Sequence, residues 1–305
     1  MSCFDEWQCD PEGYIREGEL DKAHRADAWQ TAVGLQDVDG LKTSEYLADT
    51  AREHIEGRIS IDEAQSRILS YHEERKDRLG IEEPTKEGDI VSSHMVRLLG
   101  ERAFVFSPVQ LKAVHRVLFE GLLDRAGEYR IYNITKKEWV LKGDTVVYAP
   151  AGMIEDSLTY DFSQEKSFAY GSLSKDAAIR HVASFISGIW QIHPFCEGNT
   201  RTTAVFAIKY LSSIGFVTNN DAFKSHSWYF RNALVRANYE NYETGVRPTK
   251  VYLERFFENL LLGGQHELRN RYLHVDWRED KNRAAVTPQV TPPKLRYRVR
   301  RLSAE

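Results

Sequence analysis

Two strongly apolar stretches flank one short polar loop in the second half of the chain, and this arrangement limits the possible folds more than any other feature. Before the loop, apolar residues recur at helical spacing on one wide face: Ile179, Val182, Ala183, Ile186, Ile189 and Trp190. After the loop, a second apolar series follows at once: Ala204, Val205, Ala207, Ile208, Leu211 and Ile214. Such wide apolar faces predict two deeply buried helices, and therefore a mainly α-helical fold.

The loop between these helices reads His-Pro-Phe-Cys-Glu-Gly-Asn-Thr-Arg over residues 193–201. A bare loop between buried helices would leave backbone donors without partners, so its polar residues need an explanation. Gly198 allows the chain to turn and to approach a ligand closely. Asn199, Thr200 and the free amides at the start of the second helix can face one spot, which the helix dipole makes attractive to an anion.

Three further side chains of the loop suit phosphate chemistry. Arg201 offers a planar charged fork for phosphate, and Glu197 can hold a divalent cation through oxygen, as magnesium on a nucleotide prefers. His193 titrates near neutral pH and can accept a proton from an attacking hydroxyl. Taken one at a time, these residues have ordinary explanations as a capping turn, a surface charge or a structural histidine. Their ordered combination indicates a phosphoryl- or nucleotidyl-transfer site.

The rest of the chain is predicted to be helical, with one interruption. Four serines are expected to cap helices: Ser44, Ser60, Ser107 and Ser174. A polar connector at 81–88 contains one proline and one glycine and is the predicted domain boundary. We therefore expect an N-terminal helical segment at 1–88, a catalytic domain at 89–265 and a polar, basic tail at 266–305. Between Tyr129 and Tyr148 the pattern predicts a β-hairpin or flap.

Composition excludes several protein classes. With 42% hydrophobic residues among 305, the chain has enough apolar content for a sizeable core. Its longest apolar runs are too short to span a membrane, and no secretory signal is visible, so we expect a cytoplasmic protein. Three cysteines are too few for a disulfide framework. A net charge of −4 gives no global reason to expect nucleic-acid binding, although the tail, read as solvated, is locally basic.

The loop resembles the signature of the Fic family, which in generic form is H-x-F-x-[DE]-G-N-G-R-x-x-R. The matching positions are His193, Phe195, Glu197, Gly198, Asn199 and Arg201. The resemblance extends over roughly residues 90–262 and implies a Fic-like helical bundle with a β-hairpin flap. It also implies an adenylyltransferase that uses Mg-ATP, transfers AMP to a tyrosine, serine or threonine hydroxyl of a target protein, and releases pyrophosphate.

The resemblance assigns a role to each residue of the loop. His193 would be the general base, Glu197 the magnesium ligand and Phe195 an anchor in the core. Gly198 and Asn199 would hold the phosphates. Arg201 would bind the phosphates that are distal to the transferred phosphate, and the hydroxyl of Thr200 can donate to the phosphates.

The resemblance also assigns roles, on weaker grounds, to residues of the flap and of a later helix. Ile134, Thr135, Lys136 and Lys137 would align the target as an added strand and border the nucleotide. Tyr229 and Asn238 resemble positions that contact the base and the sugar. A plain surface hairpin and an ordinary amphipathic helix explain these residues about equally well.

Two departures from the signature bear on activity and on regulation. Thr200 replaces the second glycine; kinase-like members carry lysine there, so its absence favours nucleotidyl transfer. Ala204 replaces the second arginine, with which the family's inhibitory glutamate pairs. The upstream segment resembles an antitoxin-like unit, but its candidate carboxylates, Glu56 and Asp39, fit the inhibitory pattern imperfectly. We therefore expect this segment to pack on the catalytic domain and to inhibit weakly or through another contact.

Two alternatives to an adenylyltransferase stay open. Thr200 and Ala204 can weaken the site, which would leave a regulatory or interaction protein that binds nucleotide with little turnover. A Fic-type enzyme can also transfer another nucleotide or a phosphate. The expected partner is a target protein that bears a hydroxyl side chain, and self-modification would reveal both donor and acceptor.

Overall fold

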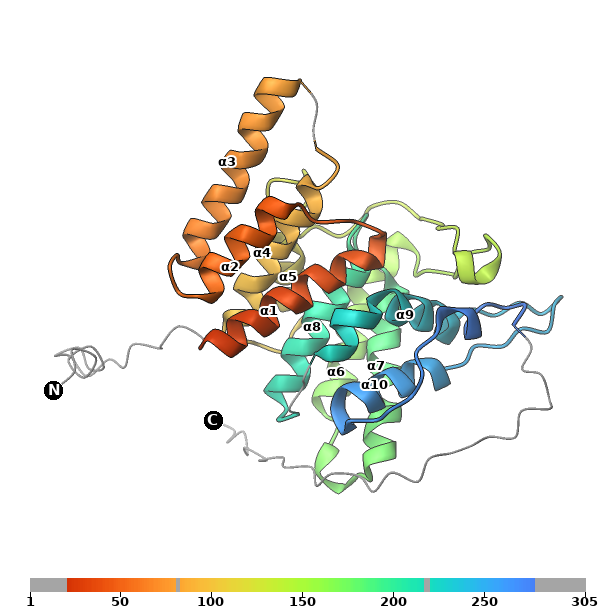
Figure 1. The fold of residues 1–305 in the computed structure, drawn as a ribbon. Coiled ribbons are helices and arrows are strands. Elements are labelled where there is room, and N and C mark those ends of the chain that lie inside the picture. The colour runs from red at the N-terminus through yellow and green to blue at the C-terminus, as the bar shows by residue number, and fades with distance from the viewer. Residues whose placement is uncertain (1–20, 81–82, 217–219, 278–305) are drawn as a thin grey trace, which may run out of the picture.

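The computed structural model describes residues 21–80, 83–216 and 220–277. Within these ranges the chain is mainly helical, as predicted, and its helices pack into one body from which α3 projects (Figure 1). The basic run at 294–301, Cys3 and Cys9 lie outside the described residues. Of the helices in this described part, none combines the length and apolarity that crossing a membrane requires.

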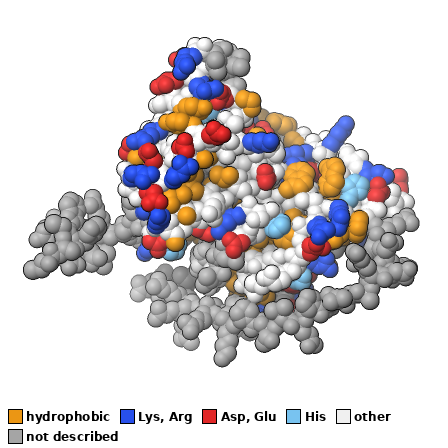
Figure 2. Space-filling model, in the orientation of Figure 1, with side chains coloured by type: hydrophobic (Ala, Val, Ile, Leu, Met, Phe, Trp, Pro, Cys, Tyr) orange, Lys and Arg blue, Asp and Glu red, His pale blue; other side chains and the backbone are white. Residues whose placement is uncertain are grey.

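The N-terminal segment forms α1 (Lys22–Gly34), the 3-10 helix η2 (Leu35–Asp39), α2 (Glu45–Ile55) and α3 (Ile61–Leu79). The predicted caps Ser44 and Ser60 are confirmed, because each hydroxyl accepts a hydrogen bond from the first turn of its helix. On the face shown in Figure 2, side chains of both charge signs alternate over these helices. Arg67, for example, pairs with Glu53 and Glu63.

The remaining helices build the body around α7 (Lys175–Ile192) and α8 (Asn199–Ser213). They are α4 (Lys86–Gly100), α5 (Pro108–Phe119), α6 (Ile154–Lys166), α9 (Asp221–Asn238) and α10 (Val251–Leu262), with short 3-10 turns η3 (Trp139–Leu141), η4 (Ala151–Met153), η5 (Tyr170–Ser172) and η6 (Asn270–Tyr272). Every residue from Asn199 to Leu211 is buried, which confirms α8 as a central helix. The predicted caps Ser107 and Ser174 also form.

One continuous hydrophobic core joins the N-terminal segment to the rest of the described chain. Trp29 of α1 and Leu35 of η2 belong to the same cluster of buried side chains as Ile186 and Phe256. Helix α1 packs against α4 and α9, and η2 packs against α8 and α9. The predicted boundary at residue 88 falls inside α4, so removing the upstream residues would expose apolar surface.

The segment predicted as a β-hairpin doubles back but contains no strand. Within it, the Glu138 amide donates to the Asp144 carbonyl at 2.9 Å, and the Lys136 amide donates to the Thr145 hydroxyl at 3.1 Å. Several of its backbone groups pair with side chains or within the turn η3, where a ladder was expected. The prediction of a chain reversal is right, and the prediction of β-strands is wrong.

Candidate active site

The loop between α7 and α8 is closed at both ends by residues in the left-handed region. His193 ends α7 with φ 51°, and Gly198 precedes α8 with φ 70°. A Cβ atom at position 198 would lie 2.1 Å from Cζ of Phe119, so only glycine fits. No side chain caps the first amides of α8, which leaves them available to an anion.

Asn199 shapes the loop with its side chain. Its Oδ1 accepts a hydrogen bond from the Phe195 amide at 2.9 Å, and its Nδ2 donates to the Phe195 carbonyl at 2.8 Å. The Thr200 hydroxyl accepts from the Trp190 indole at 2.9 Å, which ties α8 to the end of α7. The resemblance places Asn199 at the phosphates; in the structure its side chain holds the loop, so it can offer an anion only its backbone amide.

His193 is buried, and its hydrogen bonding selects one tautomer. Nδ1 lies 3.2 Å from the Trp190 carbonyl, which can only accept, so Nδ1 carries the proton and Nε2 keeps its lone pair. Burial, together with the smaller effect of the positive charges of Lys136, Arg130 and Arg231, lowers the pKa of His193 to about 3. The imidazole is therefore neutral at pH 7 and lies in a positive environment.

Arg201, in the first turn of α8, is fully buried and surrounded by acceptors from the N-terminal half of the chain. Its Nε lies 2.9 Å from Asp39 Oδ2, and its Nη2 lies 2.7 Å from Glu87 Oε1. The guanidinium also lies over the Phe119 ring. The fully buried Ala204 carries no charge, so the pairing of an inhibitory glutamate with an arginine at this position cannot form. A carboxylate–arginine contact forms at Arg201 instead. The other candidate inhibitory carboxylate, that of Glu56, pairs with Lys22 on the surface.

Glu197 lies on the exposed rim of the loop. Its backbone carbonyl accepts from His115, and its carboxylate has no partner among the described residues. A free carboxylate beside unused helix amides fits magnesium, which is commonly held by one or two protein carboxylates together with the phosphates of a nucleotide. Cys196, next to it, is also exposed.

Two buried side chains that the sequence analysis missed hold the loop from behind. Arg130 donates to the carbonyls of Ile192 and His193 and to those of Tyr132 and Ala149 on the facing loop. Burial lowers the pKa of this arginine. No pattern marks Arg130 in the sequence, because all its partners are main-chain carbonyls.

His115 is the second supporting residue. Its Nδ1 accepts from the Gly127 amide at 2.8 Å, its Nε2 lies 3.1 Å from the Glu197 carbonyl, and its ring stacks on Phe195 at 3.8 Å. Burial lowers its pKa to about 4. His115 lies within the apolar stripe of α5, which gave the only hint that it is buried.

The loop from Arg130 to Pro150 borders the site. Of its four predicted residues, Ile134 is partly buried, and Thr135, Lys136 and Lys137 are exposed. Lys136 Nζ lies 3.9 Å from Asp39 Oδ1, which places this side chain near Arg201 as well as near His193.

An ion pair that the sequence did not predict joins this loop to α9. Arg231 Nη2 lies 2.8 Å from the buried Glu138 carboxylate, and Nη1 donates to the Val38 carbonyl. Burial raises the pKa of Glu138. Arg231 therefore connects α9 to both η2 and the loop beside the site.

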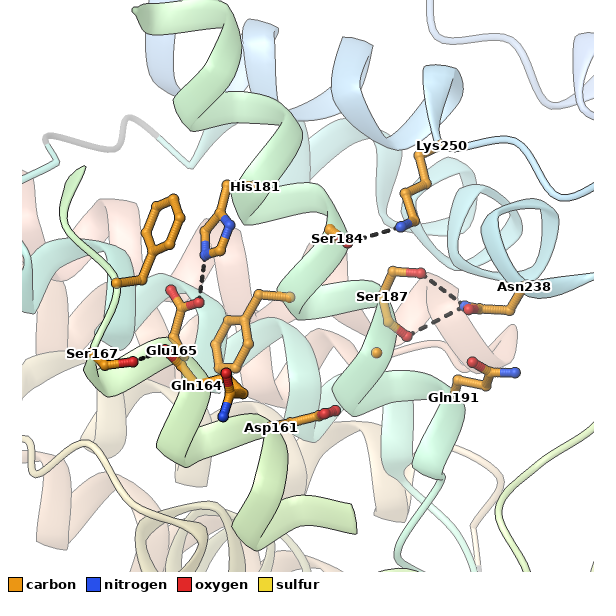
Figure 3. Close-up of a pocket in the computed structure, with 13 residues that line it drawn as sticks. Asp161, Gln164, Glu165, Ser167, His181, Ser184, Ser187, Gln191, Asn238 and Lys250 are labelled. Carbon is orange, nitrogen blue, oxygen red and sulfur yellow. Dashed lines mark hydrogen bonds and ion pairs between the residues drawn. The ribbon is translucent and has the colours of Figure 1, made fainter. Parts of the chain in front are cut away.

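The two residues predicted to contact the base and the sugar do not join this group. Tyr229 is buried two positions before Arg231, about 200° around α9, where Tyr252 and Arg255 of α10 are near it. Asn238 donates to the hydroxyl and carbonyl of Ser187 on α7 and lines a separate pocket (Figure 3). The structure brings together His193, Gly198, Thr200 and Arg201, but neither of these two.

Comparisons with known proteins agree with the geometry of the loop. Residues 105–211 match the model of the Fic/DOC family. A search of curated proteins found no match.

Three similar solved structures come from Bartonella species, and each of the three is distant. They include the BepC protein of Bartonella tribocorum with bound AMPPNP (18% identity, 60% of this chain, 89% of that chain, TM-score 0.45). The N-terminal Fic domain of an effector protein of Bartonella sp. AR 15-3 has 18% identity over 60% of this chain and 85% of that chain, with a TM-score of 0.46. The N-terminal Fic domain of a putative cell filamentation protein of Bartonella quintana with bound ADP has 20% identity over 59% of this chain and 87% of that chain, with a TM-score of 0.45. Because these likenesses are weak, the assignment depends on the family match and on the loop that it includes: the chain contains a Fic/DOC-family domain.

Proposed function

We propose that this chain is a Mg-ATP-dependent protein adenylyltransferase. In the reaction, a hydroxyl oxygen of a target protein attacks the α-phosphorus of ATP and the bond to the bridging oxygen breaks. AMP becomes attached to the target, pyrophosphate leaves, and the hydroxyl proton passes to a base. The match of residues 105–211 to the Fic/DOC family and the shape of the loop support this proposal.

The observation that carries the proposal is the state of His193. Its Nδ1 is used by the Trp190 carbonyl, so the lone pair of Nε2 is left to accept a proton. The low pKa makes His193 a weak base in the free protein, but a bound triphosphate beside it would raise that pKa. The Tyr148 ring lies 4.2 Å from the imidazole, and its buried hydroxyl has no partner in the described chain. A phosphate or a target hydroxyl would supply one.

The beginning of α8 supplies the anion site. Its uncapped amides, reached past Gly198, can donate to phosphate oxygens, and Glu197 would hold the magnesium. When bound, magnesium neutralises part of the charge that develops on the phosphates. Ile134, Thr135, Lys136 and Lys137 would border the nucleotide and the target, and Tyr229 and Asn238 would act only through the packing of α9.

The contact between Asp39 and Arg201 suggests how the N-terminal segment acts. A buried guanidinium that already pairs with Asp39 and Glu87 is not free to bind phosphate. We infer that the segment restrains the enzyme through Arg201, where the family's usual contact would be at position 204. The strength of this restraint sets how much the full chain turns over.

Labelled ATP tests the proposed activity. With the purified chain and a cell lysate as the source of targets, label from the α-phosphate should enter protein. His193→Ala should reduce transfer by about 100-fold or more while nucleotide binding persists. His226, an exposed histidine of α9, gives the matched control His226→Ala.

The other outcomes separate the alternatives. Label from the γ-phosphate would indicate a phosphotransferase, and binding without transfer would indicate a nucleotide-binding regulator. Unchanged transfer by His193→Ala would contradict the role of His193 as the base.

A further inference from the structure

A pocket of about 530 Å³ lies along α7 from His181 to Gln191, between α6, α7, the end of α9 and the beginning of α10 (Figure 3). Ser184, on its wall, precedes His193 by nine residues, which corresponds to about 13 Å of helix rise. This volume is within the range of small-molecule sites in proteins. None of the residues that form the loop from His193 to Arg201 lines it.

Two side chains on different walls of this pocket carry charges that no ion pair balances. Asp161 of α6 has neither a hydrogen-bond nor an ion-pair partner among the described residues, and burial raises its pKa. Its Oδ2 lies over Gly188, where a Cβ atom would be 3.3 Å away. Lys250, at the start of α10, donates to the Ser184 hydroxyl at 2.8 Å and has no carboxylate partner in the described chain. Partly desolvated charges without partners are costly, so each gains from an opposite charge.

The other polar groups of the pocket are already organised. The buried Glu165 carboxylate lies 2.6 Å from His181 Nε2 and accepts from the hydroxyls of Tyr170 and Tyr210, which satisfies it internally. Three amide side chains also line the pocket: Gln164, Gln191 and Asn238. Gln191 Nε2 already donates to the Val147 carbonyl and Asn238 Nδ2 to Ser187, so these two amides offer chiefly their oxygens as acceptors. The lining therefore has one carboxylate and one ammonium group without an ion-pair partner in the described chain, together with neutral hydrogen-bonding groups.

We propose that this pocket binds a small zwitterion of amino-acid or dipeptide size. Its ammonium group would pair with Asp161 and its carboxylate with Lys250, while the amide side chains hydrogen-bond the part between. Pairing both charges at once favours such a molecule over one that carries a single charge. The proposal rests on the lining of this pocket and does not depend on the proposed nucleotide transfer.

A titration of the full chain with three matched probes tests the proposal. Glycylglycine carries both charges, N-acetylglycine lacks the ammonium, and N-methylglycinamide lacks the carboxylate. Saturation-transfer NMR should show glycylglycine binding at least about tenfold more tightly than either of the others. Because this comparison uses the wild-type chain, it does not depend on whether a variant folds.

Two substitutions then locate the binding. Asp161→Asn should remove the preference over N-acetylglycine, and Lys250→Gln should remove the preference over N-methylglycinamide. Asp156→Asn, an exposed change on the same helix, should alter neither. Absence of glycylglycine binding, equal binding of the three probes, or preferences that survive both substitutions would overturn the proposal.

Discussion

The two ends of the segment 193–201, which comprises the loop and the first turn of α8, have opposite electrostatic surroundings. At one end, His193 is near the positive charges of Lys136, Arg130 and Arg231. At the other end, Arg201 is held by the carboxylates of Asp39 and Glu87. Cationic side chains surround His193, whereas the Arg201 guanidinium is already paired with carboxylates of the same chain, and only the uncapped amides beside it stay available to an anion. This difference fits the proposed phosphate site, in which the N-terminal segment holds Arg201 away from a bound nucleotide.

The largest expected effect comes from Gly198, which lies between the two ends. Gly198→Ala forces a Cβ atom to 2.1 Å from Phe119 and should displace both His193 and the amides of α8. A displacement of about 1 Å costs on the order of 100-fold in rate, so AMP transfer should fall at least that much. Steady-state kinetics with labelled ATP measures the loss.

Gly121→Ala is the matched control for this substitution. Gly121 also has a positive φ, 75°, but no atom lies within 4 Å of the added Cβ. It should lose only the backbone preference of glycine, about 1 kcal/mol of stability, and little transfer. Equal losses of transfer in the two variants would show that backbone strain, and not contact with Phe119, makes Gly198 necessary.

Removing the Asp39 carboxylate should make the surroundings of Arg201 less negative and thus more like those of His193. Asp39→Asn keeps the shape of η2 but removes one negative charge that competes with phosphate, so ATP should bind about five- to tenfold more tightly. Calorimetry with a non-hydrolysable ATP analogue measures this affinity. The exposed Asp37 of the same turn provides the control Asp37→Asn. Unchanged affinity in Asp39→Asn would mean that this contact only stabilises the fold.

A smaller effect concerns stability and pH at the His193 end. Burial depresses the pKa of His193 to about 3 and of His115 to about 4, below the value of about 6.5 for an unfolded histidine. Between pH 6.5 and 4 the unfolded chain therefore binds more protons, so the free energy of unfolding should fall as pH falls through this window. The slope is at most about 1.4 kcal/mol per pH unit for each histidine.

Urea unfolding at pH 7, 6 and 5 measures this dependence. His115→Phe keeps an aromatic ring against Phe195 and should reduce the slope. A free energy of unfolding that is constant or rises on acidification would contradict the depressed pKa values.

The sequence predicted the parts of this molecule that depend on local patterns. Helical spacing located α7 and α8, and the serine caps formed because an N-cap needs only residues within one turn. The loop was identified because the order of its residues is itself the signal. The β-hairpin was predicted wrongly because alternating residues cannot show that the loop's backbone is satisfied by side chains.

Contacts between residues far apart in the sequence could not be predicted from such local patterns. Asp39 and Arg201 are far apart in sequence, and Asp39 differs from the family's inhibitory glutamate, so nothing local joined them. Arg130 binds only carbonyls, which carry no residue identity. Tyr229 was assigned to the nucleotide by resemblance, but the neighbouring Arg231 is the residue that α9 directs toward the site.

The most direct test of the account is the titration of His193 by NMR with selectively labelled histidine. In the free chain the imidazole should stay neutral, with its proton on Nδ1, down to at least about pH 5, because its pKa is about 3. Addition of magnesium and a non-hydrolysable ATP analogue should raise that pKa, since the triphosphate would lie beside the ring. A free-chain pKa near 6.5, or a His193 signal that bound nucleotide leaves unchanged, would contradict the claim that this loop is the nucleotide site.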